Sequence, residues 1–203
     1  INLTTSPTVL NFDNIGSGLP PGVFVASNGS ATSQGTPEIF NSAKGLWSAS
    51  AVGFKNYASA TGLTSASTST DQDNSTNRAL GVRQTSATGF DPGASFIFVL
   101  TNTTGKNNLK MDFQLQSLDN TSTRTTTWSV DYAIGDSPTN FTNATPTGTL
   151  TTGGSTFSNN AVSVTFPAAV NNQSQKVWIR IITKAATTGS SNRASTGVDD
   201  VKF

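Results

Sequence analysis

The chain has 203 residues, of which 11% are charged and 34% are hydrophobic, and its formal net charge is +1. It contains no cysteine and no histidine, which excludes disulfides, thiol nucleophiles, Cys/His zinc sites and imidazole general bases. A net charge so close to zero gives no electrostatic basis for binding nucleic acid or an anionic membrane surface. No apolar run approaches the ~20 residues of a transmembrane helix.

Short segments in which apolar and polar residues alternate dominate the sequence. Such alternation predicts strands with one buried face. The clearest example places Leu109, Met111, Phe113 and Leu115 between charged and amide side chains. The segment 95–100 is almost wholly apolar, as is typical of a strand buried on both faces. In chain order, the predicted strands are 9–13, 22–26, 47–54, 78–83, 95–100, 109–116, 128–134, 162–166, 177–182 and 198–203.

These strands are separated by glycine, proline, asparagine and aspartate turn signals. No segment combines a helical apolar period with a cap and sufficient length. Many short strands without helices predict an all-β fold, and we favour a two-sheet antiparallel jelly-roll β-sandwich with its first and last strands side by side. Residues 1–203 are expected to form a single domain. The polar segments 58–77 and 135–160 are predicted to be long loops at the ends of the sandwich, where binding sites are common.

Two aspartates near the chain ends are candidate ligands of a structural Ca²⁺ ion. Asp13 follows the first predicted strand, and Asp199 precedes Val201 by two residues in the last one. If these strands are neighbours, the two carboxylates converge, and Ca²⁺ prefers oxygen ligands. Alternation places Asp199 on the inner face with Val201, where an unpaired carboxylate is costly. The alternative is that Asp199 accepts hydrogen bonds from loop amides or pairs with an arginine.

Aromatic side chains supply a candidate carbohydrate site, because sugars stack their apolar faces on aromatic rings while polar side chains bind the hydroxyls. Trp178 and Arg180 alternate with apolar residues in the segment 177–182, so they share one face of a strand. They form either an exposed binding patch or a second buried face in which Arg180 pairs with an acid. Trp47 and Tyr57 lie near a predicted loop and are further candidates for sugar binding.

Catalysis is not expected. Glycoside hydrolysis needs two carboxylates flanking the scissile bond, and Glu38 is the sole glutamate, in a turn-like segment. Without histidine, a serine nucleophile would need lysine or aspartate as its base. No Gly-x-Ser-x-Gly elbow occurs in the chain.

Several fragments in this order resemble a family of secreted bacterial β-modules that occur in large extracellular proteins of Bacteroidetes and similar bacteria. The fragments are the region of Trp47 and the segments 77–81, 102–105, 128–132, 177–180 and 197–201. The resemblance covers about residues 9–203 and implies a jelly roll similar to carbohydrate-binding modules. In calcium-bearing modules of this kind the last strand reads apolar-Asp-x-apolar-x-apolar. The segment 198–203 matches, with Asp199 at the ligand position, whereas Asp13 stands where those modules usually have glutamate.

The resemblance and the aromatic residues together lead us to expect a non-catalytic carbohydrate-binding module with a structural calcium ion. It would belong to a larger secreted bacterial protein outside the cell. The expected partners are a polysaccharide or other glycan and neighbouring domains of the same protein, but neither nucleic acid nor membrane. The alternative is a structural or adhesive extracellular β-sandwich that acts as a spacer without a sugar site. Exposed aromatic residues on one sheet face would favour sugar binding, and burial of every tryptophan and tyrosine would favour the spacer.

Overall fold

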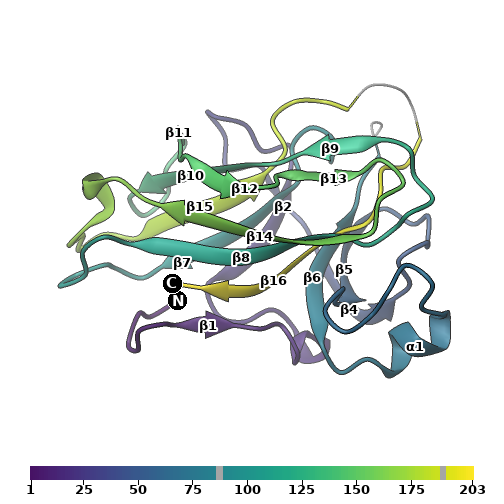
Figure 1. Cartoon of the computed structure of the whole chain (residues 1–203). Coiled ribbons are helices and arrows are strands. Elements are labelled where there is room, and N and C mark those ends of the chain that lie inside the picture. The colour runs from purple at the N-terminus through teal and green to yellow at the C-terminus, as the bar shows by residue number, and fades with distance from the viewer. Residues whose placement is uncertain (86–88, 188–190) are drawn as a thin grey trace.

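The computed structural model describes residues 1–85, 89–187 and 191–203. Two β-sheets pack face to face around one hydrophobic core (Figure 1). The larger sheet has eight strands in the order β12-β14-β8-β16-β6-β5-β4, with β1 also paired to β16. Its strands are β1 (Val9–Leu10), β4 (Phe40–Gly45), β5 (Gly53–Ala58), β6 (Arg78–Arg83), β8 (Lys110–Ser117), β12 (Pro146–Gly148), β14 (Ser158–Thr165) and β16 (Thr196–Lys202).

The smaller sheet has six strands in the order β11-β10-β15-β7-β2-β3. They are β2 (Val23–Ser27), β3 (Thr36–Pro37), β7 (Ser95–Leu100), β10 (Ser129–Ile134), β11 (Thr142–Asn143) and β15 (Val177–Ile182). A separate two-stranded sheet pairs β9 (Thr125–Thr127) with β13 (Thr151–Gly153). In the part of the chain that the structure describes, the helical elements are α1 (Ser69–Asn74) and two 3₁₀ turns, Ile15–Ser17 and Ala168–Val170. None of the helices in the described ranges is long and apolar enough to span a membrane.

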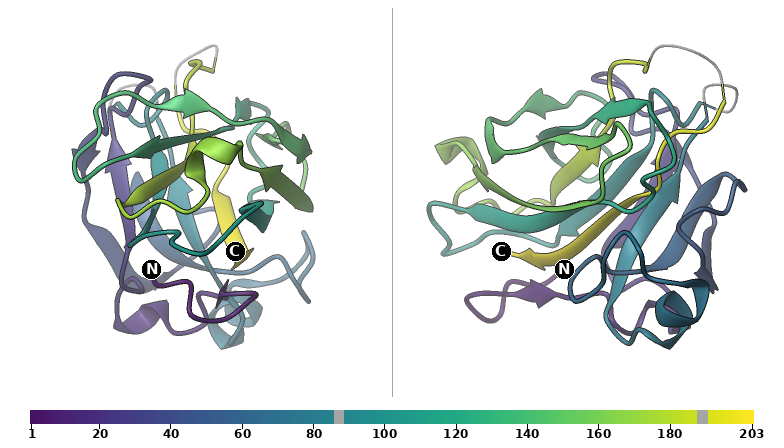
Figure 2. Two further views of the ribbon diagram at one scale, coloured as in Figure 1. Left: turned by 90° about the vertical axis from the view of Figure 1, so that its left-hand side faces the viewer. Right: turned by 45° about the vertical axis from the view of Figure 1, so that its right-hand side comes forward.

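The connections confirm the predicted two-sheet β-sandwich. From β6 onward the long strands alternate between the layers, with β6, β8, β14 and β16 in the larger sheet and β7, β10 and β15 in the smaller one. This alternation is typical of a jelly roll. The turned views in Figure 2 show the two layers from other sides. Strand pairing among the described residues is antiparallel except between β4 and β5, which run parallel.

The first and last strands lie side by side, as the sequence predicts. β1 pairs antiparallel with β16, with Val9 opposite Lys202. The pairing continues beyond both strands, since the amide of Thr8 donates to the carbonyl of Phe203 over 2.9 Å. The chain ends therefore join within one sheet (Figure 1).

The core lies between the inner faces of the two sheets. The best predicted strand, β8, sends Met111, Phe113 and Leu115 into it, and all three are buried. Trp128 stacks on Phe96, with ring centroids 5.4 Å apart. The apolar positions of the sequence pattern thus correspond to the inner faces of the long strands.

Three segments differ from the expectation. The predicted loop 135–160 contains the short strands β11, β12 and β13 and the start of β14. Instead of one strand at 47–54, the structure has β4 and β5 on either side of the loop that carries Trp47. Within the predicted loop 58–77 lies the short helix α1, which begins with a capping box: the Thr68 hydroxyl accepts from the Asp71 amide over 3.2 Å, and the Asp71 carboxylate accepts from the Thr68 amide over 2.8 Å. Neither β4 nor α1 has a regular apolar pattern, because no residue of β4 is buried and α1 buries only Gln72.

Candidate functional site

The outer face of the six-stranded sheet carries accessible aromatic side chains. Phe24 on β2 is 51% exposed, and Trp178 on β15 is partly buried against β7. Both residues are paired with residues of the strand between them, β7: Phe24 lies opposite Ile97, and Trp178 lies opposite Val99. Directly paired residues point to the same face of a sheet, and so do residues two apart on one strand, such as Ile97 and Val99. These four side chains therefore form one patch on the outer face, which we call the outer patch.

Two adjoining hollows lie on this outer patch, and both are lined by Phe24 and Trp178. The first has a volume of about 240 Å³ and is also lined by Gln34 and Glu38. The second has a volume of about 440 Å³ and is also lined by Lys176. Because the two aromatic residues belong to both hollows, we describe the pair of hollows as one groove.

A hydrogen bond from the indole nitrogen of Trp178 holds its ring in place. Its indole Nε1 donates to the carbonyl of Gly135 over 2.9 Å. That donor is therefore already used, and the side chain offers a ligand apolar contact rather than a hydrogen bond. Such a preoriented ring loses little conformational entropy when a ligand stacks on it.

The first hollow also offers hydrogen-bond acceptors. Glu38 Oε1 accepts from the Ser27 hydroxyl over 2.5 Å, and Gln34 Nε2 donates to the carbonyl of Pro138 over 2.9 Å. The second carboxylate oxygen of Glu38 and the amide oxygen of Gln34 accept no hydrogen bond from the described residues. Both side chains are therefore held in place with an acceptor left for a ligand.

Arg180 shares the outer face with Trp178 but lies entirely inside the protein, so its predicted role in sugar binding is wrong. Its guanidinium forms two hydrogen bonds of 2.8 Å with the carboxylate of Asp131, and both side chains are fully buried. The carbonyls of Ser30 and Ser33 also accept from it, over 2.8 and 2.7 Å. The Phe141 ring covers it, with the centroid 3.4 Å from Cζ. The alternative reading of the sequence, an arginine paired with an acid, describes Arg180 correctly.

Trp47 and Tyr57 are also buried, at 4% and 0% exposure, so the prediction that they bind sugar is wrong. Trp47 packs on Phe157 with ring centroids 5.1 Å apart, and its Nε1 donates to the carbonyl of Ala58 over 2.9 Å. The Tyr57 ring lies so close to Gly81 that a Cβ there would come 2.1 Å from Cδ2. Burial raises the pKa of Tyr57 to about 12. Both rings belong to a second, smaller hydrophobic core.

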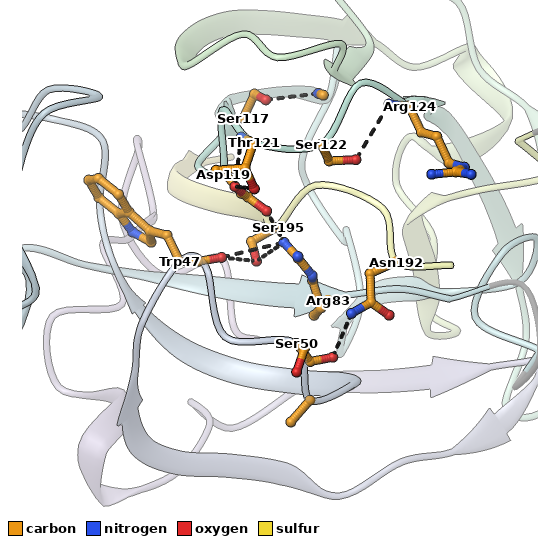
Figure 3. Close-up of polar contacts among 12 residues, drawn as sticks. Trp47, Ser50, Arg83, Ser117, Asp119, Thr121, Ser122, Arg124, Asn192 and Ser195 are labelled. Atoms are coloured by element: carbon orange, nitrogen blue, oxygen red, sulfur yellow. Dashed lines mark hydrogen bonds and ion pairs between the residues drawn. The ribbon is translucent and has the colours of Figure 1, made fainter. Parts of the chain in front are cut away.

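A buried polar network holds the Trp47 loop in place (Figure 3). The carbonyl of Trp47 accepts from the Ser195 hydroxyl over 2.7 Å and from Arg83, which forms an ion pair with Asp119. Burial acts to raise the pKa of Asp119, but hydrogen bonds from Thr121 and Arg83 outweigh it and keep the pKa below its ordinary value. None of these residues lines the groove, so we assign the network a structural role.

Asp199 is buried, but not on the face that the alternation predicts. Val198 and Val201 both face the core, because Asp200 adopts a φ of +49° and the register of β16 with β8 shifts there. Such a bulge reverses the alternation beyond it, which brings Val201 back to the face of Val198. Asp199 therefore points to the opposite face of the sheet, away from the core that lies between the two sheets. The Ser59 hydroxyl donates to its Oδ2 over 2.7 Å, and the Asp200 amide donates to its Oδ1 over 2.8 Å.

The second predicted calcium ligand, Asp13, lies in the turn after β1 and is exposed. Its carboxylate accepts from the Arg78 amide over 3.1 Å and from the Asn11 side chain over 2.8 Å. Burial raises the pKa of Asp199 to about 7, and the charges of Asp200 and Asp13 add to the increase. No lysine or arginine in the described part of the chain forms an ion pair with Asp199.

Few side chains near Asp13 and Asp199 could act as ligands of a cation. No cluster of three or more histidine, cysteine, aspartate or glutamate side chains that could hold a metal occurs among the described residues. A Ca²⁺ ion would therefore depend on Asp13 and Asp199 together with hydroxyl, carbonyl or water oxygens, all of which Ca²⁺ accepts.

No protein-family model and no curated protein matches the chain. Solved structures with a similar fold include the K1 cleaved adhesin domain of Lys-gingipain from Porphyromonas gingivalis W83, at 16% identity and a TM-score of 0.44, covering 98% of this chain and 97% of that one. Another is a structure of carbohydrate-binding modules of the β-sandwich superfamily, at 11% identity and a TM-score of 0.42, covering 94% of this chain and 60% of that one. Similarity of this extent assigns neither a family nor a function to the chain.

Proposed function

We propose that the chain is a non-catalytic glycan-binding module of an extracellular protein and that the groove over Phe24 and Trp178 is its binding site. The observation that carries the proposal is that these two accessible aromatic side chains line both adjoining hollows on one sheet face. Aromatic rings stack on the apolar faces of sugars. The available oxygens of Gln34 and Glu38 complement sugar hydroxyls, as polar groups in mostly apolar ligand sites generally do.

The groove is suited to binding without hydrolysis. The first hollow contains a single carboxylate, from Glu38, and none lines the second. Both retaining and inverting glycosidases generally place two carboxylates on either side of the scissile bond. One acceptor carboxylate can hold a hydroxyl but does not form such a pair.

We also propose that Asp13 and Asp199 take part in a structural Ca²⁺ site. The proposal is supported by the buried carboxylate of Asp199, which has no cationic partner among the described residues, and by the contribution of Asp13 to its raised pKa. When bound, the ion would neutralise these charges. It would also connect β16 with the turn that follows β1.

An adhesive or spacer module without a sugar site is the second candidate. It is favoured by the burial of Trp47, Trp128 and Tyr57, which leaves Trp178 as the one tryptophan with substantial access to solvent. In this case the outer patch would contact protein instead of sugar.

Retention on immobilised neutral polysaccharides tests the first candidate. We expect the wild-type protein and Val9→Ala to be retained and Trp178→Ala to elute early. Val9 is a matched control because it is 48% exposed but lies on β1 of the other sheet. Unchanged retention of both Trp178→Ala and Phe24→Ala would remove the groove as the site. Absence of wild-type retention on every polysaccharide would favour the spacer.

A further inference from the structure

We infer that the groove binds an internal stretch of a linear, uncharged polysaccharide and excludes acidic glycans. This inference rests on the proposed function and adds the class of ligand to it. It depends on two features of the outer patch: the separation of its two aromatic residues and the charge of the side chains around them.

Phe24 and Trp178 are placed on strands that are not neighbours. β7 lies between β2 and β15, so the two strands are ~10 Å apart. Phe24 pairs with Ile97 and Trp178 pairs with Val99, two residues further along β7, which adds ~7 Å in the strand direction. The two Cα atoms are thus ~12 Å apart. A ligand that covers both positions must contain more than one sugar unit.

The size and position of the groove also suit a polymer. The hollows of about 240 and 440 Å³ lie side by side and share both aromatic walls. Sites for drug-sized ligands occupy ~300–1,000 Å³. The second hollow alone falls in this range, and the first adds further length to the site. Because the groove lies on the outside of a sheet rather than inside the sandwich, a polysaccharide can continue past both ends.

The charges near the first hollow disfavour anionic sugars. Glu38 contributes a carboxylate oxygen without a donor from the described residues, and no lysine or arginine of the described chain lines this hollow. Lys176 lines the second hollow and remains exposed, 3.2 Å from the exposed carboxylate of Asp136, whereas Arg180 is buried against Asp131. The repulsion of an acidic glycan therefore comes from the first hollow, where Glu38 lies. Hydroxyl groups satisfy the free acceptors of this hollow, whereas a uronate or sulfate group would be repelled by Glu38.

Calorimetric titration with two length series of oligosaccharides tests the inference. The first series is neutral, namely linear gluco-, manno- and xylo-oligosaccharides of one to six units, and the second is oligogalacturonides of the same lengths. For at least one neutral series we expect affinity to rise about ten-fold or more from the monomer to the hexamer, with no binding of oligogalacturonides. Phe24→Ala and Trp178→Ala should each weaken hexamer binding about five-fold or more.

Glu38→Gln tests the charge separately, because it removes the negative charge but keeps an acceptor oxygen. We expect this variant to bind the neutral hexamer within about two-fold of wild type and to gain affinity for the oligogalacturonides. The melting temperature of each variant, compared with that of Val9→Ala, shows whether it is folded.

The possible failures can be distinguished. Equal affinity for monomer and hexamer, or tighter binding of the acidic series by the wild-type protein, would overturn the inference while leaving glycan binding intact. If no member of any series binds, both the inference and the proposed function fail, and the outer patch is better explained as a protein contact.

Discussion

Neighbouring side chains on one strand can have opposite accessibility, as Trp178 and Arg180 show. The alternation of β15 correctly places both on one face, but the loop between β2 and β3 covers only Arg180, through the carbonyls of Ser30 and Ser33. These contacts join residues far apart in the sequence, so no local pattern predicts them. Phe24 could have been found, because it stands between the apolar, inward-facing Val23 and Val25.

The buried pair of Arg180 and Asp131 leads to a stability prediction. Removal of one partner leaves an uncompensated buried charge, which typically costs about 3–5 kcal/mol. Lys184, 2.7 Å from Asp131, still pairs with the remaining carboxylate. We therefore expect Arg180→Ala to lower the free energy of unfolding in urea denaturation by about 3 kcal/mol, at the lower end of that range. Lys176→Ala, which breaks an exposed pair with Asp136, is the control and should cost less than about 1 kcal/mol. Equal effects of the two substitutions would contradict this reading of the buried pair.

Asp199 makes the stability depend on pH. Burial raises the pKa of its carboxyl from 3.8 to about 7, so the folded state binds this proton more tightly than the unfolded state does. The stabilisation is present below pH ~4 and is lost as pH rises to about 7. In a chelating buffer we expect the free energy of unfolding to fall by up to ~3 kcal/mol between pH 5 and pH 8. In Asp199→Asn we expect the free energy of unfolding to change much less over the same pH range.

The pH dependence of stability should change in the opposite direction when Ca²⁺ is present. An ion that binds only the folded state raises stability by mass action, and it competes with the proton on Asp199. We expect millimolar Ca²⁺ to raise the melting temperature more at pH 8 than at pH 5, and Asp13→Asn and Asp199→Asn to lose this increase. A melting temperature that does not respond to Ca²⁺ at pH 8 would count against the proposed ion without affecting the glycan site.

Among the strands, period-two alternation predicts the long central ones because successive side chains point to opposite sheet faces. It does not predict β4, which has no buried residue, or α1, which buries one side chain. It also assigns Asp199 to the wrong face, since a bulge at Asp200 reverses the alternation in mid-strand. The elements that the pattern misses are therefore those with little apolar surface to bury or with an irregular backbone.

Gly81 on β6 is packed closely against Tyr57 on the neighbouring strand β5, so we expect a larger residue there to destabilise the fold. A Cβ at this position would come 2.1 Å from Cδ2 of the buried Tyr57 ring, and a fully packed core resists such insertion. We expect Gly81→Ala to lower the free energy of unfolding by about 1–3 kcal/mol. Gly16→Ala is the matched control, because its nearest neighbour would be 3.8 Å away. A Gly81→Ala protein as stable as Gly16→Ala would show that the ring moves aside easily.

For the protein as a whole, the two outer faces differ in chemistry. The eight-stranded sheet also has a hollow of about 400 Å³, but the charged side chains of Asp112, Asp200 and Lys202 line it and, among the described residues, no aromatic side chain other than Phe113 does. The six-stranded sheet presents the outer patch with Phe24 and Trp178. The sequence predicts the sandwich and the adjacent chain ends. It does not predict which face remains accessible, because that depends on how the loops fold over each sheet.

The most direct test is to map a bound neutral oligosaccharide by NMR chemical-shift perturbation on the ¹⁵N-labelled protein. We expect the largest shifts at the indole N–H of Trp178 and at the amides of β2, β7 and β15 around the groove, with the signals near Asp112 and Lys202 unchanged. Shifts confined to the hollow on the eight-stranded sheet would contradict the assignment of the glycan site to the Phe24–Trp178 groove.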